Sequence, residues 1–482
     1  MAECAGMDGA ALMAMTARHV TVAELVDDHR SRRDILACFD MDQERSAAAA
    51  ILDGLELIGL VEPREGVIEW AGPEPPELLR RLVALRDGPA RALIGLPKEE
   101  DCPLTVYAVP DGGDGLSPYL RAWGGAAGTG FSRRAAAASC LFEVAERCSQ
   151  MRAGDESVRT AALADLGDDA VPPDRLLLNE PADPAVTPLD ARTPISWAVA
   201  HHVGTGETRW LPAEYCYRSA VRDRSVWTCP ADSSGCASGV STDDVVVRGF
   251  LELVERDAVA IWWFNRLRRP SVPAEMGDLD AVRAIAAWQH RRGRRLHHLD
   301  LTSDLGIPVV AAVSCDVTGR GIAVGFGAHF DPAVAAIKAS LEMIQFQAMI
   351  ELSLRFRGLV PGEPSESTKA ALGWFEDVAI GDEAYLLADA DAVPAPQWAD
   401  SPSPSERLAR CLAVAAHHDL DVFHLDLTRS WIGIPVGRVF IPGLRSLEKR
   451  FGPGRLFDVP VAMGWLSSQR ATSDLNPRRM VF

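Results

Sequence analysis

The chain has 482 residues, 48% of them hydrophobic and 24% charged, a composition typical of globular proteins that excludes a disordered or fibrous chain. At roughly 150 residues per domain, this length predicts two or three domains. The 67 acidic residues outnumber the 49 basic ones and give a formal net charge of −18. This charge argues against sequence-independent binding of nucleic acid or anionic lipid, because both are negatively charged.

The sequence shows no pattern of a membrane span or a secretory signal. Its longest unbroken apolar runs, such as residues 258–264, are much shorter than the roughly 18 residues that cross a bilayer. Glu3 and Asp8 precede the first basic residue, Arg18, which is unlike a signal peptide. We therefore expect a cytoplasmic protein without membrane contacts, whose ten cysteines are reduced.

Residues 1–95 are predicted to form a small winged-helix-like module. Apolar residues recur at helical spacing over residues 44–60, and an extended segment follows through residues 67–70. Two interpretations stay open: a packing domain, or a module that docks a peptide or partner by adding a strand to its wing. Acidic residues outnumber basic ones on the predicted second helix, which disfavours DNA binding.

Residues 96–482 mix β-type runs with long alanine-rich stretches, which predicts an α/β (α+β) catalytic domain. Residues 308–314 and 421–427 are predicted strands. The glycine-rich residues 124–130 predict a flexible turn before the first helix of this domain, and residues 72–76, 110–115 and 393–404 predict linkers or turns.

Three predicted helices carry closely spaced glutamates. Residues 139–147 and 249–256 contain the pattern ExxER, and residues 339–345 contain ExxQ. Because positions i and i+3 share one face of a helix, Glu143 lies beside Glu146 and Glu252 beside Glu255. The residues around these pairs, and around Glu342, are mostly apolar, which is typical of buried helices.

Buried carboxylates need a proton, a basic partner or a cation, because an unpaired buried charge is strongly destabilising. Arg147 and Arg256 offset only part of this charge. Oxygen ligands without Cys or His suit Mg²⁺, which is commonly bound together with substrate phosphates. The residues thus indicate a Mg²⁺–polyphosphate site between helices, with a structural salt-bridge network as the alternative. The phosphate-loop pattern GxxxxGK[ST] does not occur in the sequence.

In this order, the motifs resemble the YcaO family of ATP-dependent enzymes that activate backbone amides. The resemblance covers residues from about 95 to the end. The forms ERDA and WW.N within residues 251–265 are similar to the branch that makes azolines in peptides. The other matching blocks are residues 128–147, 233–239, 325–331, 342–345, 426–429, 433–435, 441–444 and 475–477.

The resemblance implies a YcaO-type ATP-binding catalytic domain over residues 96–482. It implies that ATP phosphorylates a peptide amide oxygen after a neighbouring Cys, Ser or Thr side chain adds to the carbonyl carbon. Loss of phosphate then leaves a thiazoline or oxazoline. The implied Mg²⁺ ligands are Glu143, Glu146, Glu252, Glu255 and Glu342. The same five glutamates, together with Arg256, are the implied catalytic residues. The implied nucleotide contacts are Ser139, Arg147, Ser234, Arg256, Lys338 and Gln345.

The resemblance also implies partners: a ribosomally made precursor peptide, a leader-binding ThiF-like protein and a flavin dehydrogenase in the same complex. A homodimer is compatible with the sequence. Thr129 stands where the family often has Lys, Ser234 and Val240 where Asn is common, and Lys338 where Arg is usual. Residues 476–482 differ from the proline-alternating tail of azoline-forming members.

These departures keep two alternatives open. One is a thioamide- or amidine-forming enzyme with the same ATP chemistry, and the other is a catalytically weak scaffold subunit. The histidine doublets at residues 201–202, 297–298 and 417–418 have no nucleophile motif nearby, so we expect them to be structural.

Overall fold

The computed structural model describes residues 61–64, 67–70, 93–96, 101–109, 125–180, 189–218, 232–277, 279–355, 357, 366–392 and 402–480. The strand predicted at residues 67–70 is present as β2 (Val67–Trp70) and pairs antiparallel with β1 (Val61–Arg64). The helix predicted over residues 44–60 and the breaks at residues 72–76 and 110–115 lie outside the described residues. The winged-helix-like module therefore stays a prediction.

The other described strands form three sheets in which neighbouring strands are antiparallel. The first has the order β3–β4–β5 (Ile94–Gly95, Thr105–Val109, Ala126–Gly130). The second has the order β10–β11–β12 (Arg294–Asp300, Val309–Asp316, Ala323–Ala328). The third has six strands, β6–β7–β13–β14–β9 with β8 also paired to β7 (Val158–Ala162, Pro194–His202, Phe423–Asp426, Val436–Phe440, Cys236–Ser238, Thr208–Pro212). Strands β11 and β13 confirm the strands predicted at residues 308–314 and 421–427.

Three long helices contain the ExxER and ExxQ patterns, as predicted: α6 (Arg133–Gln150), α10 (Thr242–Asn265) and α13 (Pro332–Arg355). Ser132 and Ser241 cap α6 and α10 by accepting hydrogen bonds from backbone N–H groups of the first turn. The remaining α-helices are α7 (Leu163–Leu166), α8 (Pro173–Leu177), α9 (Ala213–Cys216), α11 (Ala274–Gly277), α12 (Asp280–Arg291), α14 (Glu366–Asp377), α15 (Arg407–His417) and α16 (Arg455–Ala462).

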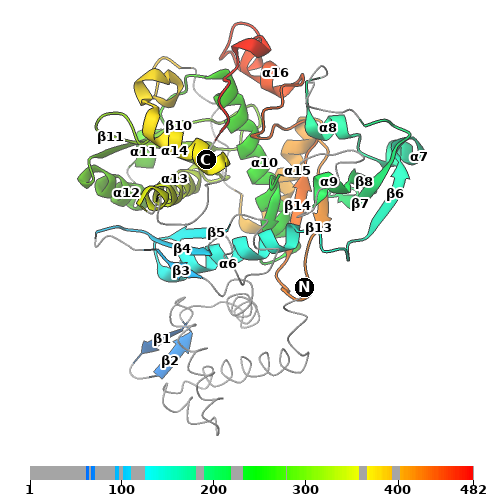
Figure 1. Ribbon diagram of the computed structural model, residues 1–482, viewed down its shortest axis with the longest axis horizontal. Coiled ribbons are helices and arrows are strands. Elements are labelled where there is room, and N and C mark those ends of the chain that lie inside the picture. The colour runs from blue at the N-terminus through cyan, green and yellow to red at the C-terminus, as the bar shows by residue number, and fades with distance from the viewer. Residues whose placement is uncertain are drawn as a thin grey trace.

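Helix α10 lies at the centre of the described residues and contacts strands of two sheets (Figure 1). It packs on β14 and β9 of the six-stranded sheet and on β12 of the β10–β12 sheet. Its aromatic residues Trp262, Trp263 and Phe264 are almost completely buried in one large hydrophobic cluster. The helix that carries Glu252 and Glu255 is thus held between two sheets.

The prediction of a flexible turn over residues 124–130 is wrong, because Ala126–Gly130 form strand β5. Its glycines serve close packing, since a Cβ at Gly128 would overlap the α6 backbone at Cys140 and Ala136. Strand β12 meets α13 in the same way, and a Cβ at Gly325 would overlap the backbone at Met343 and Ala339. Glycine in these strands lets a helix lie against the strand backbone.

A buried carboxylate anchors α10 to the end of the chain. The side chain of Asp257 is fully buried and accepts hydrogen bonds from the Arg455 guanidinium (2.7 Å for the shortest) and from the Arg445 backbone N–H (2.9 Å). Arg455 also binds Asp304, which precedes β11 (2.7 Å). Since breaking such a buried pair leaves an uncompensated charge, this network fixes α10 relative to α16 and the β10–β11 connection.

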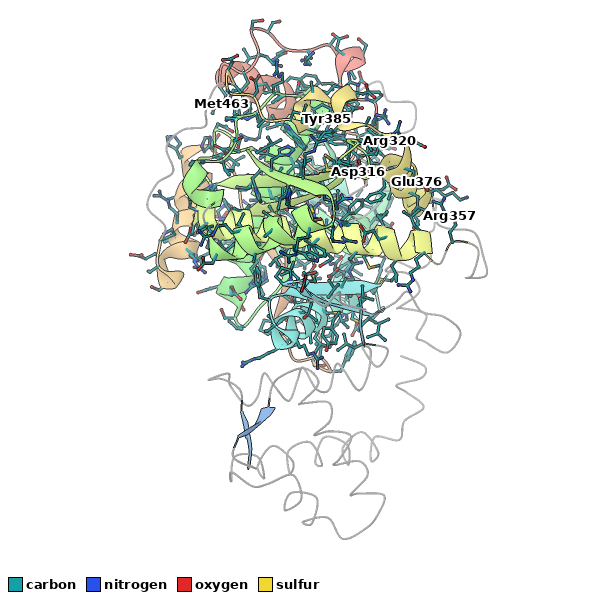
Figure 2. The ribbon with its side chains drawn as sticks, turned by 90° about the vertical axis from the view of Figure 1, so that its left-hand side faces the viewer. Asp316, Arg320, Arg357, Glu376, Tyr385 and Met463 are labelled. Atoms are coloured by element: carbon teal, nitrogen blue, oxygen red, sulfur yellow. The ribbon has the colours of Figure 1, made fainter. Side chains whose placement is uncertain are left out.

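Helix α13 is long and apolar enough to span a membrane by composition, a property it shares with core helices of soluble proteins. In this structure it packs on β11 and β12. Beyond its C-terminal end, Arg357 pairs with Glu376 of α14 (2.7 Å). Arg320, from the β11–β12 turn, donates to the carbonyl oxygen of Asp377 on the same helix (2.8 Å; Figure 2). The packing of α13 on these two strands supports its assignment as a core helix.

We expect Gly325→Ala to lower the free energy of unfolding by about 1–3 kcal/mol, because the added methyl group would force α13 away from β12. Urea unfolding followed by circular dichroism measures this change. Gly381→Ala is the matched control, since a Cβ there would meet no atom within 4 Å. An equal effect of the two substitutions would contradict this account of the glycine.

Candidate functional site

The three glutamate-bearing helices converge around short strands. Helix α6 contacts β5 and β9, α10 contacts β9 and β12, and α13 contacts β12 and β5. Each helix follows a strand of this set in the chain, so the site combines three strand–helix units from distant parts of the sequence. The close approach at Gly128 and Gly325 brings α6 and α13 directly onto their strands.

The five predicted glutamates form a chain of electrostatic neighbours from α6 through α10 to α13, which we call the glutamate row. The charges of Glu143 and Glu252 both act on Glu146. The charge of Glu255 acts on Glu252 and also on Glu342. Glu146 and Glu252, and likewise Glu255 and Glu342, are therefore electrostatic neighbours although each pair is about 100 positions apart in the chain.

Two arginines in the row each bind the glutamate four positions before them on the same helix. Arg147 Nε donates to Glu143 (2.7 Å), and an Arg256 terminal nitrogen donates to Glu252 (3.3 Å). Glu143 also accepts a hydrogen bond from the Ala127 backbone N–H of β5 (3.3 Å). In the same way, Glu342 accepts a hydrogen bond from the backbone N–H of Phe326 in β12. Two glutamates of the row are thus tied to the strand that their helix packs on.

Burial and mutual repulsion disfavour the ionised state of several carboxylates. Burial raises the pKa of Glu252 to about 7, against the opposing charge of Arg256 and with a further rise from Glu255. Burial raises the pKa of Glu342 to about 7 as well, and Glu255 adds to that rise. Burial and the charges of Glu252 and Glu143 raise the pKa of Glu146 well above its usual range. Without a cation, part of the row holds protons near neutral pH.

The donor atoms of the row fit Mg²⁺, because they are carboxylate oxygens with no Cys or His among them. Within the described part of the chain, no three His, Cys, Asp or Glu side chains stand close enough to hold one metal ion as they are. Glu143 and Glu252 instead face their arginines. To bind one ion, the side chains of the row would turn toward it, and their assignment as ligands stays a prediction.

The predicted nucleotide contacts surround this row. Ser139 is exposed on α6 one turn before Glu143, and Lys338 is exposed on α13 one turn before Glu342. Gln345 lies one turn after Glu342 and accepts a hydrogen bond from the Thr129 hydroxyl of β5 (3.0 Å). This bond joins β5 to α13, so Thr129, which stands where the family often has Lys, contacts the predicted nucleotide residue Gln345.

Ser234 lies just before β9, and its carbonyl oxygen accepts a hydrogen bond from the buried Arg438 (3.1 Å). Arg438 also binds Asp232 (2.9 Å), and the charge of Asp232 acts on Glu252. Asp232 is a sixth carboxylate beside the row that the sequence analysis missed. The sequence held no signal for it, because its loop becomes a neighbour of Glu252 only through the fold.

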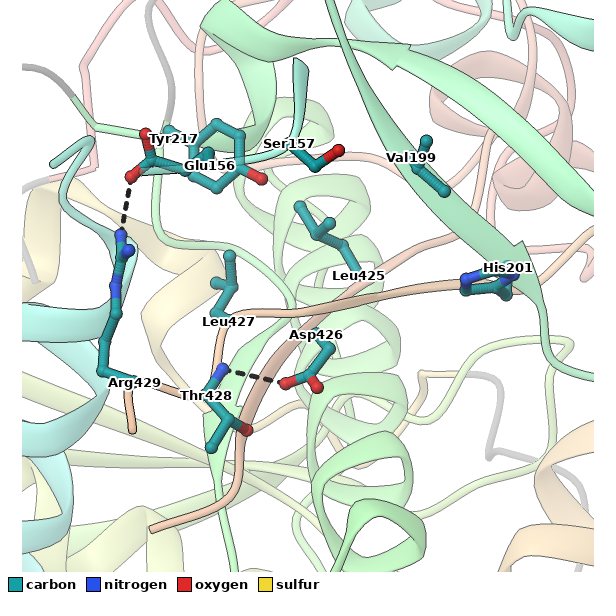
Figure 3. A pocket seen from close by; sticks show the side chains of 10 residues that line it. All are labelled: Glu156, Ser157, Val199, His201, Tyr217, Leu425, Asp426, Leu427, Thr428 and Arg429. Carbon is teal, nitrogen blue, oxygen red and sulfur yellow. Dashed lines mark hydrogen bonds and ion pairs between the residues drawn. The ribbon is translucent and has the colours of Figure 1, made fainter. Parts of the chain in front are cut away.

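The histidine doublets have three different environments. His297 Nε2 donates to the carbonyl oxygen of Leu386 (2.7 Å), and His298 contacts the buried hydroxyl of Ser340 (2.8 Å). His417 and His418 pack edge to face on each other at the end of α15. His201, by contrast, lines a cavity beside β7 (Figure 3). The prediction of a purely structural role for this doublet did not include a cavity.

Comparison with protein families finds a match over residues 127–445 to the model described as YcaO cyclodehydratase, ATP- and Mg²⁺-binding. An uncharacterized protein of Methanothermobacter thermautotrophicus is 27% identical over 328 residues, which cover 66% of this chain and 81% of that protein. An uncharacterized protein in the tfuA 3′ region of Rhizobium leguminosarum bv. trifolii is 34% identical over 128 residues, or 23% of this chain and 30% of that protein.

Several solved structures share the fold. A heterocyclase in complex with substrate and cofactor is 30% identical with a TM-score of 0.72, covering 81% of this chain and 55% of that one. The heterocyclase TruD is 28% identical with a TM-score of 0.63, and the match covers 83% of this chain and 57% of TruD. The chain thus spans little more than half the length of these two heterocyclases.

The YcaO of Methanopyrus kandleri, bound with AMPPCP and Mg²⁺, is 22% identical with a TM-score of 0.52, covering 77% of this chain and 91% of that one. At this identity the likeness concerns the fold alone. The family match, in contrast, spans well over half of the chain and contains every residue of the glutamate row. The chain belongs to the YcaO family, a family of enzymes that depend on ATP and Mg²⁺.

Proposed function

We propose that this chain uses ATP and Mg²⁺ to activate backbone amides of a ribosomally made precursor peptide and converts Cys, Ser or Thr residues into thiazolines or oxazolines. The observation that carries this proposal is the glutamate row, in which all five predicted glutamates of three separate motifs are neighbours. The likeness at 28–30% identity to two heterocyclases supports the ring-forming branch.

The proposed reaction needs no nucleophile from the enzyme. The thiol or hydroxyl of the peptide adds to the preceding carbonyl carbon, and the carbonyl oxygen takes the γ-phosphoryl group of ATP. Phosphate then leaves with that oxygen as the ring closes, so that the peptide loses one water and ATP becomes ADP and phosphate. Bound Mg²⁺ would neutralise the phosphate charge, with the glutamate row as its ligands.

Arg256 is the residue of this chain best placed to stabilise the transferring group. It is held by Glu252 at 3.3 Å and is also within electrostatic reach of Glu255 and Glu342. When these carboxylates bind a cation instead, the guanidinium is free to donate to a phosphate oxygen. A planar guanidinium binds phosphate with two parallel hydrogen bonds, which Lys cannot reproduce.

We further propose that residues 1–95, or a ThiF-like partner protein, bind the leader of the precursor, and that a flavin dehydrogenase oxidises the rings in the same complex. The antiparallel pair of β1 and β2 supports a docking role for this module, because a peptide strand can pair with the edge of a small sheet.

The proposal predicts a mass loss of about 18 Da per ring when the protein is incubated with ATP, Mg²⁺, the precursor peptide and its encoded partner, since one water leaves per ring. Mass spectrometry of the peptide measures this change. Glu252→Gln should abolish it, whereas Glu376→Gln, which breaks an exposed ion pair far along α14, should leave it unchanged. A gain of about 16 Da, sulfur for oxygen, would instead identify a thioamide-forming enzyme, and an amidine would likewise overturn ring formation.

The scaffold alternative makes a separate prediction. For a catalytic subunit we expect titration calorimetry to show micromolar binding of ATP with Mg²⁺, weakened at least about tenfold by Glu255→Ala, because Glu255 joins both halves of the row. Glu376→Gln again serves as the control. Absence of nucleotide binding by the unmodified chain would contradict the enzymatic proposal and favour a scaffold.

The raised pKa values predict a pH-dependent stability of the metal-free protein. The pKa of Glu252 is about 7 in the folded protein and near 4.5 in the unfolded chain. The contribution of protonated Glu252 to the free energy of unfolding is therefore fully present below pH 4.5 and is lost as the pH rises through about 7. Wild type should therefore lose on the order of 2 kcal/mol more than Glu252→Gln between pH 5 and pH 8. Urea unfolding at both pH values measures this difference, and ATP with Mg²⁺ should reduce it. Parallel pH profiles for the two proteins would rule out this account.

A further inference from the structure

The loop of residues 232–235, just before β9, is held firmly on β14. Within the loop, the Cys236 backbone N–H donates to the carbonyl oxygen of Ser233 (3.0 Å) and closes a tight turn. The Val439 backbone N–H of β14 donates to the carbonyl oxygen of Gly235 (2.7 Å). Gly235 has a φ of 77°, and a Cβ there would overlap the Val439 carbonyl oxygen. The loop can therefore lie on β14 only with glycine at this position.

Helix α10 approaches the same loop through Gly249. A Cβ at Gly249 would lie 2.6 Å from the carbonyl oxygen of Gly235, so only glycine allows this contact. Glu252 follows Gly249 by three positions and shares its face of the helix. Leu253 also reaches the loop, because its Cδ1 lies 3.2 Å from the Cβ position of Gly235. Packing thus makes the loop a direct neighbour of the turn of α10 that carries Glu252.

Arg438 of β14 anchors this loop from the interior of the protein, where its side chain is only 1% exposed. Its guanidinium donates to the carbonyl oxygen of Ser234 (3.1 Å) and to the carboxylate of Asp232 (2.9 Å). It also donates to the carbonyl oxygen of Tyr215 (2.6 Å). Because a guanidinium is planar and its donors have fixed directions, these bonds set the positions of Asp232 and Ser234 relative to β14.

The two carboxylate oxygens of Asp232 have different environments. Oδ1 accepts hydrogen bonds from Arg438 (2.9 Å) and from the Ser234 backbone N–H (3.0 Å). Oδ2 is buried and has no hydrogen-bond partner within the described part of the chain. Nearly all buried polar atoms in proteins are hydrogen-bonded, so an oxygen of this kind suits a ligand that brings positive charge.

Negative charge is in excess where the loop meets α10. The charges of Asp232 and Glu255 both act on Glu252. Arg438 binds Asp232 and Arg256 binds Glu252, so the two arginines balance two of the three carboxylates. The remaining charge favours a cation at this place, because uncompensated carboxylates are costly away from water.

Strand β9 links this loop to α6. The Ser238 backbone N–H donates to the carboxylate of Glu146, and the Ser238 hydroxyl donates to the carbonyl oxygen of Phe142 (3.0 Å). The charge of Glu252 acts on Glu146 as well. Asp232 precedes β9 and acts on Glu252, so it belongs to the half of the glutamate row that α6 and α10 form.

We propose that Asp232 is a sixth acidic residue of the Mg²⁺ site, which supplies a fixed negative charge through Oδ2 for the ion that Glu252 binds, and that Arg438 is its positioning residue. Glu252 gives up its bond to Arg256 before it binds an ion, whereas Asp232 is already held by Arg438. Asp232 therefore loses little side-chain freedom when the ion binds. This assignment rests on the proposed role of the glutamate row.

Binding of Mn²⁺, which prefers the same oxygen ligands as Mg²⁺, tests the assignment without any assay of activity. Electron paramagnetic resonance of free Mn²⁺ measures its dissociation constant for the full-length protein. We expect Asp232→Asn to weaken binding at least about fivefold, because it removes one of the charges that attract the ion. The asparagine oxygen can still accept the bonds from Arg438 and Ser234, so the melting temperature should stay unchanged. Equal dissociation constants, or a wild-type protein that binds no Mn²⁺, would overturn the proposal.

Asp244→Asn is the matched control. Asp244 also binds an arginine, Arg248 (2.9 Å), and accepts a hydrogen bond from a backbone N–H, that of Val240 (3.2 Å). It lies eight residues before Glu252 on the same helix, which is about 12 Å along the axis. An equal loss of Mn²⁺ affinity in Asp244→Asn and Asp232→Asn would show a general effect of acidic charge and would contradict a specific role of Asp232.

The Mg²⁺ dependence of ring formation separates a role in metal binding from a purely structural one. For Asp232→Asn we expect the Mg²⁺ concentration that gives half-maximal ring formation to rise at least about fivefold, with a rate at saturating Mg²⁺ within about twofold of wild type. A rate that high Mg²⁺ does not restore would indicate that Asp232 acts only on the structure of the loop, against the proposal.

Glu252→Gln distinguishes a failure of this inference from a failure of the proposed function. Weaker Mn²⁺ binding in Glu252→Gln but not in Asp232→Asn would overturn the role of Asp232 alone. Weaker Mn²⁺ binding in both variants of a protein that forms no ring from ATP and peptide would contradict the proposed chemistry and leave the metal site with Asp232 standing.

Discussion

Five carboxylates on three packed helices cannot all be ionised beside one another without a cation, and the surrounding structure is arranged about that constraint. Arg147 and Arg256 each compensate one glutamate on their own helix. Glu146 and Glu342 have raised pKa values, and bound Mg²⁺ would supply the positive charge that these carboxylates lack. A site of this kind attracts a polyanion only with its metal, which agrees with the acidic net charge of the chain.

The row exists because its helices cannot move apart easily. Gly128 and Gly325 let α6 and α13 lie on the backbones of β5 and β12, close enough for Glu143 and Glu342 to reach strand N–H groups. Helix α10 is fixed by burial of its aromatic residues and by the pairing of Asp257 with Arg455. The same glycines that give close packing thus also set the position of two carboxylates.

The helices of the site were predictable, because glutamates at i and i+3 within apolar surroundings leave a clear pattern in the sequence. Strand β5 was not, since Ala126–Gly130 has no large apolar residues in alternation and its glycines favour a turn by composition. Asp232 and the cavity beside β7 were also out of reach. Both depend on which loops and strand ends meet in space, and a local pattern carries no information about that.

Asp426 and Arg429 lie three positions apart but have different physical roles, which their sequence alone does not distinguish. Arg429 binds the carbonyl oxygens at the C-terminal end of α6, where a cation also interacts favourably with the helix dipole, and so joins the six-stranded sheet to the helix of Glu143 and Glu146. Asp426 holds nothing comparable in place, because its carboxylate accepts only a local backbone N–H within the described residues. A substitution of Arg429 would therefore disturb the C-terminal end of the helix that carries Glu143 and Glu146, whereas a substitution of Asp426 removes an exposed charge and one local hydrogen bond.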